Sequence, residues 1–297
     1  MRDRQLHDHH HPSSSENLKI AFFLNFGFTI LEIAGGFWTN SIAILTDSVH
    51  DLGDSISLGL AWYFERLSVR HRDAQHTYGY RRFRLMGGLI TGLMLLAGLG
   101  FVLYHAIGRL ADPQEVHAPG MIGLAILGVV FNGAAVLRMK HGHSLTERLV
   151  NWHLLEDTLG WMAVLIGAAV MAIWKLPIVD PLLSIGISVF VLWNVVRNLS
   201  KVFAVILQRT PEGFDADEFE REAGELDGIE SLHHIHCWTI DGESHVLTAH
   251  LVLDHQVTDI PGLKGKVRAL LDGKGFEHVT LETEQIGDAC PQGNDED

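Results

Sequence analysis

Residues 46–54, TDSVHDLGD, carry four ionisable side chains inside a long apolar segment. If the segment is helical, Asp47, His50, Asp51 and Asp54 lie on one face, because they stand at positions i, i+3, i+4 and i+7. Ionisable side chains at membrane depth are costly, and they are retained where they face a bundle interior, a partner or an ion. This stretch therefore predicts a polar site inside a bundle of membrane helices.

A second apolar segment repeats part of this pattern. His153 and Asp157, in the sequence HLLED, stand one helical turn apart. Two helices that each offer one imidazole and one carboxylate provide four ligands for a tetrahedral site, and this donor set suits Zn²⁺ and its near relatives. The alternative is a buried polar network that holds the two helices together, which leaves carboxylates without clear partners.

The negative charge of the chain is concentrated in its C-terminal part. The formal net charge is −14, and the residues from Glu212 onward contribute 21 Asp and Glu against 5 Lys and Arg. Such an acidic domain argues against nucleic acid as a partner. The two cysteines, Cys237 and Cys290, cannot form a disulfide framework or a CxxC metal site, which is typical of a reducing compartment. We expect Cys237 to be a buried strand residue.

Six segments approach or reach the roughly 20 apolar residues that a membrane-spanning helix needs. They cover residues 18–38, 41–64, 84–107, 121–139, 151–174 and 178–196. The first segment carries Asn25, Thr29 and Glu32 on one face, which we expect to point inward and to hydrogen-bond to neighbouring helices. Ligation of a metal by Glu32 is the second choice. The predicted fold class is an α-helical membrane protein with six transmembrane helices.

The basic residues of the loops predict the orientation of this bundle. One set of loops carries Arg66, Arg70, Arg72, Arg81 and Arg82 after the second segment and Arg138, Lys140 and Arg148 after the fourth. The opposite loops carry only Arg109 and Lys175. Because cytoplasmic loops are enriched in Lys and Arg, both termini are expected in the cytoplasm.

The residues after Pro211 predict a small soluble α/β domain. Residues 215–226 and 261–271 have helical patterns, while 231–240, 244–254 and 277–285 have strand patterns. Asp241 and Gly242 form a hairpin signal between the first two strands. The expected order is α-β-β-α-β, a ferredoxin-like arrangement. The expected domains are a tail at 1–17 containing His7, His9, His10 and His11, a membrane domain at 18–209, a cytosolic domain at 210–287, and a disordered end at 288–297.

Residues 41–54, SIAILTDSVHDLGD, and residues 153–157, HLLED, resemble the paired motifs of the cation diffusion facilitators. The resemblance extends over about residues 18–285. The family consists of dimeric exporters that exchange a divalent metal ion for protons. It implies a transport site at His50, Asp54, His153 and Asp157, with zinc as the ion. Asp47 is then interpreted as a residue that orients His50 without binding the metal, and Asp51 as a spare carboxylate on the pathway.

The resemblance also implies two further metal sites. In the loop after the second segment, Asp73 and His76 fit an exposed site, although Tyr80 stands where many relatives have another histidine. In the cytosolic domain, His233, His250, Glu282 and Glu284 match positions of a regulatory site at the dimer interface, with His236 and His234 as neighbouring donors.

These observations predict a homodimeric inner- or plasma-membrane antiporter that exports Zn²⁺ in exchange for protons and is not an enzyme. Three alternatives remain at this point. The same fold can carry Fe²⁺, Co²⁺, Cd²⁺ or Mn²⁺; the chain can be an intramembrane metal-dependent hydrolase, with Glu156 as its candidate base; or it can be a metal sensor that does not transport.

Overall fold

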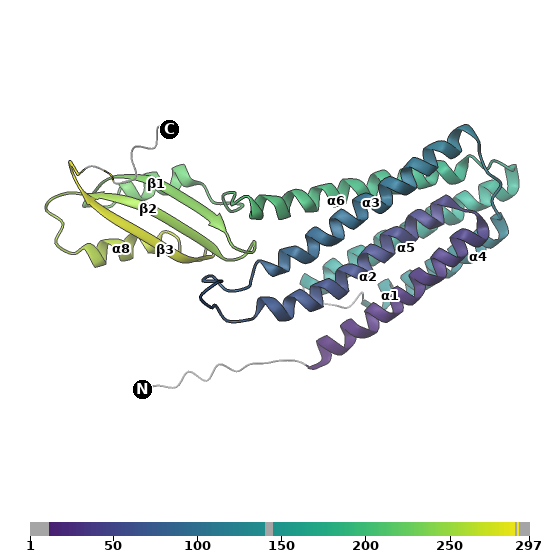
Figure 1. Cartoon of the computed structure of the whole chain (residues 1–297), viewed down its shortest axis with the longest axis horizontal. Helices are drawn as coiled ribbons and strands as arrows, with labels where there is room; N and C mark the ends of the chain where they lie inside the picture. The colour runs from purple at the N-terminus through teal and green to yellow at the C-terminus, as the bar shows by residue number, and fades with distance from the viewer. Residues whose placement is uncertain (1–11, 140–144, 289, 291–297) are drawn as a thin grey trace. The chain divides into compact units, whose positions relative to one another are not determined.

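A computed structural model of the chain describes residues 12–139, 145–288 and 290 (Figure 1). The described residues form two compact units. One unit contains the residues up to Tyr63 together with Gly87–Leu199, and the other contains Phe64–Met86 together with the residues from Ser200 onward. The connection between the second and third helices therefore belongs to the same unit as the C-terminal domain. The N-terminal histidines and Lys140 lie outside the described residues.

Six long helices lie over the six apolar segments, within the part of the chain that the structure describes. They are α1 (Pro12–Thr39), α2 (Ile42–Ser68), α3 (Phe83–Ala111), α4 (Ala118–Met139), α5 (Leu145–Trp174) and α6 (Val179–Ile206). Among the described residues, α3, α6 and the Leu154–Trp174 part of α5 are long and apolar enough to cross a membrane by length and composition. The expectation of a helical membrane domain is confirmed.

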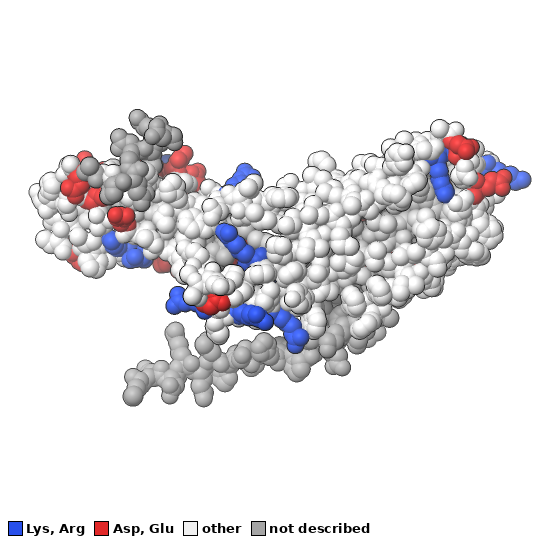
Figure 2. Space-filling view, in the orientation of Figure 1, with Lys and Arg blue, Asp and Glu red and all other residues white. Residues whose placement is uncertain are grey.

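The surface of these helices is apolar where a water-soluble protein would be polar. Phe101, Val130 and Trp193 expose between 61% and 70% of their surface, and many other large apolar side chains are also exposed. Figure 2 shows that the visible face of the long helices is largely without charged residues, which gather toward the helix ends. Exposed apolar surface of this extent indicates contact with lipid.

Polar contacts and small residues hold the helices together. Thr46 on α2 and Ser184 on α6 share a hydrogen bond of 2.6 Å. Gly128 on α4 lies so close to the indole of Trp161 on α5 that an added Cβ atom would overlap it. Such small residues let membrane helices approach closely. Gly92 on α3 is a second case, because an added Cβ atom there would overlap the Leu199 side chain of α6.

The start of α2 is held by a residue of another helix. Asp180, fully buried in the first turn of α6, accepts hydrogen bonds from Ser41 Oγ at 2.5 Å and from the main-chain N–H groups of Ile42 at 2.8 Å and Ala43 at 3.2 Å. These N–H groups belong to the first turn of α2 and have no partner within their own helix. The Arg109 guanidinium lies 3.9 Å from the Asp180 carboxylate. Asp180 thus caps α2 and sets where its polar stripe begins.

The C-terminal domain contains α7 (Ala216–Gly224), β1 (Ile229–Thr239), β2 (His245–Leu253), α8 (Ile260–Ala269) and β3 (Phe276–Gln285). The predicted element order is confirmed, with ends that differ by a few residues. Asp215 caps α7 and Asp259 caps α8 through their side-chain oxygens. The sheet has the order β1-β2-β3, with β1 and β2 antiparallel and β2 and β3 parallel. The parallel pair requires a crossover, which α8 provides.

Candidate metal centres

The four ionisable residues of the stripe on α2 differ in how deeply they are buried. Asp47 and Asp51 are buried, whereas His50 and Asp54 are half-buried. His50 Nε2 lies 3.8 Å from Asp54 Oδ2, as expected for residues four apart on a helix. The helix therefore presents one imidazole and one carboxylate side by side.

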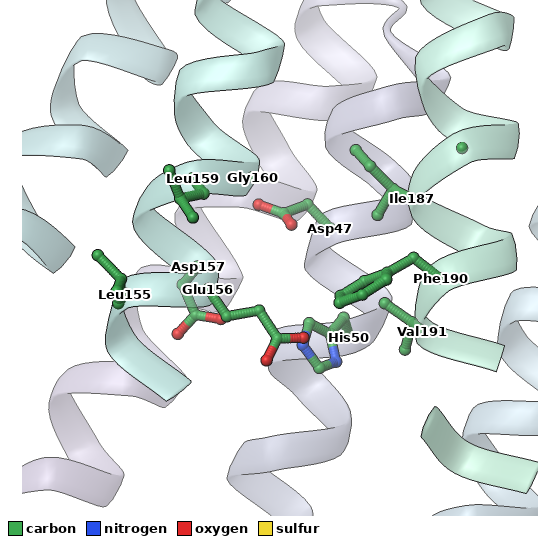
Figure 3. Close-up of a pocket in the computed structure, with 11 residues that line it drawn as sticks. Asp47, His50, Leu155, Glu156, Asp157, Leu159, Gly160, Ile187, Phe190 and Val191 are labelled. Carbon is green, nitrogen blue, oxygen red and sulfur yellow. The ribbon is translucent and has the colours of Figure 1, made fainter. Parts of the chain in front are cut away.

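A cavity of about 470 Å³ joins this stripe to α5 and α6. Asp47 and His50 line it from α2, and Asp157 lines it from α5 (Figure 3). Its other lining residues are Leu155, Glu156, Leu159, Gly160, Gly186, Ile187, Phe190 and Val191. Of the four predicted transport ligands, His50 and Asp157 thus share a cavity and Asp54 lies next to His50. The side chain of His153 is outside the described part of the structure, and its backbone belongs to α5.

Glu156 also lines this cavity, and Figure 3 shows its carboxylate on the same side as the His50 ring. The sequence pattern singled out Asp157 by its spacing to His153 and gave Glu156 no place among the ligands. Glu156 and Asp157 both line the cavity at the part of α5 that faces α2 and α6. Glu156 therefore adds a carboxylate that helical spacing alone did not assign.

The inward face of α1 is only in part the hydrogen-bonded face that was expected. Asn25 Nδ2 donates to Ser55 Oγ on α2 at 3.0 Å, which ties the two helices together. Thr29 bonds within its own helix, to the Asn25 carbonyl. Glu32 is fully buried, yet neither of its carboxylate oxygens accepts a hydrogen bond from the described residues. The expected interhelical hydrogen bond thus forms at Asn25, whereas Thr29 bonds within α1 and the Glu32 carboxyl lies beside that of Asp51 on α2.

In the connection between α2 and α3, the Asp73 carboxylate accepts hydrogen bonds from residues of the same loop. Asp73 Oδ2 accepts a hydrogen bond of 2.5 Å from the Tyr80 hydroxyl, and Oδ1 accepts from the main-chain N–H groups of Gln75 and His76. These bonds lower the pKa of Asp73 to about 2, with the Tyr80 bond as the largest cause. His76 Nδ1 lies 3.5 Å from Asp73 Oδ1. Asp73 and His76 are adjacent, but the carboxylate oxygens already have donors.

In the C-terminal domain, four side chains offer ligand atoms that all lie within 4.8 Å of one another. They are His233 on β1, His250 on β2, Glu284 on β3 and Cys290 after β3. Of the predicted donors, Glu282 is exposed but lies 3.5 Å from His250 Nε2, and His236 is exposed. Burial alone would raise the pKa of Glu284, but hydrogen bonds with His250 and Cys290 bring it below its ordinary value.

A bulge in β1 explains which histidines meet. The register between β1 and β2 shifts between His233 and His236, and His234 has a φ of 50°. His tolerates this left-handed conformation better than most residues. As a result, the rings of both His233 and His234 lie near that of His250, at centroid distances of 5.2 and 5.1 Å. Regular alternation along a strand would have placed these two neighbours on opposite faces.

Comparison with known proteins identifies the family. Residues 18–207 match the family model described as the cation efflux transmembrane domain. The chain belongs to the cation efflux family. The match to this family runs from the second turn of α1 to the end of α6.

Several cation efflux proteins are similar over nearly their whole length. The "Cadmium, cobalt and zinc/H(+)-K(+) antiporter" of Bacillus subtilis strain 168 is 31% identical over 284 residues, covering 94% of this chain and 91% of that protein. The "Metal cation efflux system protein CzcD" of Cupriavidus metallidurans is 30% identical, covering 94% and 89%. The "Zinc transporter ZitB" of Escherichia coli K12 is 30% identical, covering 94% and 92%.

Membership in the cation efflux family confirms the predicted family and the prediction of a divalent metal cation transporter. It also confirms that the chain is not an enzyme, because members of this family are transporters. The hydrolase alternative, which had Glu156 as its candidate base, is therefore removed.

Proposed function

We propose that this chain is a Zn²⁺/H⁺ antiporter that moves zinc out of the cytoplasm by alternating access. The observation that carries the proposal is the cavity between α2, α5 and α6, where His50, Asp47 and Asp157 meet inside an apolar helical unit. The relatives support the choice of metal, since one is named a zinc transporter and another is named for cadmium, cobalt and zinc.

The transport site in this proposal consists of His50 and Asp54 on α2 and of His153 and Asp157 on α5. Asp47 orients His50, and Asp51 adds a carboxylate to the pathway. Zinc requires neutral imidazoles and ionised carboxylates, so zinc and protons compete for the same atoms. Binding from the cytoplasm therefore releases protons, and release on the far side takes protons up.

The change between the two openings of the site depends on which helices carry the ligands. All four belong to α2 and α5, so a tilt of these two helices against their neighbours opens the cavity to either side while the ligands stay together. Such a movement couples the two openings because both depend on the same pair of helices.

The topology of the proposal has six membrane spans, one for each of α1 to α6, within a membrane domain at 18–209. Both termini and the ferredoxin-like domain at 210–287 lie in the cytoplasm, and the chain acts as a homodimer in the inner membrane. The arginines of the connection between α2 and α3 support this orientation, because cytoplasmic loops are enriched in basic residues. The cytosolic domain binds a second, regulatory metal ion.

Cadmium and cobalt are the alternative substrates, since the Bacillus relative is named for both. Both ions accept imidazole and carboxylate ligands, so the donor set alone does not separate them from zinc. Competition of each metal with zinc for transport in the experiment below ranks the three ions.

Zinc uptake into everted membrane vesicles tests the proposal. We expect the intact protein to take up zinc and to release protons. His50→Ala lowers uptake at least about 100-fold, because loss of an outer-shell partner of a metal site already costs 10–100-fold. His105→Ala, which removes an exposed imidazole on α3, is the matched control and leaves uptake unchanged. Uptake that survives His50→Ala contradicts the site, and absence of uptake for every divalent metal favours a sensor.

A further inference from the structure

The cluster of His233, His250, Glu284 and Cys290 lies on the face of the sheet away from its two helices. The helices pack on Leu247, Ala249, Leu251 and Leu253 of β2, together with residues of the other strands. His250 stands between these residues along the strand and therefore points to the other face. His233 and His250 are direct partners across the antiparallel pair, so their side chains project to the same side.

The individual distances bring the four side chains around one point. His250 Nδ1 lies 2.7 Å from Glu284 Oε1 and 3.6 Å from Cys290 Sγ. His233 Nε2 lies 3.3 Å from Glu284 Oε2. Ligands of a tetrahedral zinc ion are separated by roughly 3.3–3.8 Å, as follows from Zn–N and Zn–S bonds of about 2.0–2.3 Å. The cluster is thus within small side-chain movements of a coordination shell.

One atom of the cluster lacks the hydrogen bond that its burial calls for. His233 Nε2 is buried and makes no hydrogen bond to the described residues, although it faces the Glu284 carboxylate. A buried polar atom without a hydrogen bond is costly, and a metal ion supplies the missing interaction. His250 is 5% exposed and is held from its other side, since Nε2 lies 3.5 Å from Glu282 Oε2.

The position of Cys290 is produced by a turn that follows β3. Gly287 has a φ of 89°, and Asp288 closes the turn by hydrogen bonds in both directions with Gln285. The chain therefore turns back after β3, which brings the Cys290 thiol next to His250. Asp288 and Cys290, which the sequence pattern assigned to a disordered end, make these contacts.

We propose that His233, His250, Glu284 and Cys290 bind one metal ion within a single chain, with Cys290 as a thiolate ligand. Glu282 is then a positioning residue that orients the His250 ring, as carboxylates behind metal-bound histidines commonly do. A shell of two imidazoles, one carboxylate and one thiolate favours Zn²⁺, Cd²⁺ and Co²⁺ over Mn²⁺ and Mg²⁺. The inference rests on the proposed regulatory metal ion and names its ligands. The ion joins all three strands to the segment that follows β3.

Cobalt binding to the full-length protein in detergent tests the ligand set. Thiolate-bound Co²⁺ gives an intense near-ultraviolet charge-transfer absorption, whereas the proposed transport site contains no sulfur and gives none. We expect this band in the intact protein and in Cys237→Ser, which removes the other cysteine. Cys290→Ser abolishes the band. Added zinc removes the band from the intact protein, while Mn²⁺ in the same excess does not.

A second measurement keeps the test independent of how well one variant folds. In Cys237→Ser, Cys290 is the only thiol, and saturating zinc slows its alkylation about tenfold or more, because a metal-bound thiolate is a poor nucleophile. Absence of the band in the intact protein, its survival in Cys290→Ser, or equal alkylation with and without zinc overturns the inference. Neither the cobalt band nor the alkylation rate depends on zinc transport. Measuring zinc transport by Cys290→Ser therefore distinguishes failure of this metal site from failure of the transport proposal.

Discussion

The Tyr80 hydroxyl determines how the loop between α2 and α3 uses its carboxylate. A zinc site here would need the oxygens of Asp73, but three donors already occupy them. The His76 ring lies 4.2 Å from that of Tyr80, so the tyrosine occupies the space beside the imidazole. Asp73 and His76 are therefore not part of the proposed transport pathway, and a metal site at these two residues remains a prediction from the family resemblance.

The pKa of Asp73 provides a test of the hydrogen bond between Tyr80 and Asp73. At about 2 it lies below the ordinary value of 3.8, so the ionised carboxylate stabilises the loop at neutral pH, and this contribution is lost as the pH falls toward 2. Tyr80→Phe removes the main cause and moves the pKa up toward 3.8. Carbon NMR of labelled aspartate carboxyls measures the shift, with Tyr78→Phe as the control. Equal Asp73 titration in both variants contradicts the assigned hydrogen bond.

The start of α2 depends on a residue of α6. Asp180 supplies acceptors for the first N–H groups of α2, and Arg109 on α3 donates to the Asn40 carbonyl at 2.7 Å just before them. Three helices therefore meet at one buried carboxylate. Since α2 carries His50 and Asp54, this junction fixes one end of the helix that presents the proposed transport ligands.

Asp180→Asn tests this junction. The substitution keeps the shape but replaces one acceptor oxygen by an NH₂ group, which then faces a main-chain N–H or the Ser41 hydroxyl. We expect a loss of about 1–3 kcal/mol of stability, the cost of one unsatisfied buried group. Thermal unfolding in detergent measures it, and Asp112→Asn on the exposed connection after α3 is the control. An unchanged unfolding midpoint contradicts the capping role.

The elements themselves followed from local patterns. The i, i+3, i+4, i+7 stripe of α2 and the Asp241-Gly242 hairpin are encoded by neighbouring residues, and both occur where they were predicted. The cluster around His250 depends instead on tertiary structure. His236 was expected as a donor, but the bulge in β1 leaves it exposed. Cys290 joins the cluster only through the turn at Gly287, and no spacing rule connects it to His233 or His250.

The helical region and the C-terminal region differ in charge and in hydropathy. The helical region presents apolar surface and keeps its carboxylates inside, whereas the residues from Glu212 onward carry a large excess of negative charge. An acidic domain attracts divalent cations before they reach a transport site. Metal bound in that domain regulates transport if it binds more tightly in one conformation of the transporter than in the other.

Zinc flux in proteoliposomes under an imposed pH gradient shows whether the protein exchanges zinc for protons at the proposed site. Protons leave an acidic lumen through an antiporter as zinc enters, so liposomes that are acidic inside accumulate zinc. We predict accumulation by the intact protein, its loss when the gradient is collapsed, and its loss in Asp54→Ala at equal protein content. Zinc accumulation that ignores the gradient, or that Asp54→Ala retains in full, contradicts the claim that His50, Asp54, His153 and Asp157 exchange zinc for protons.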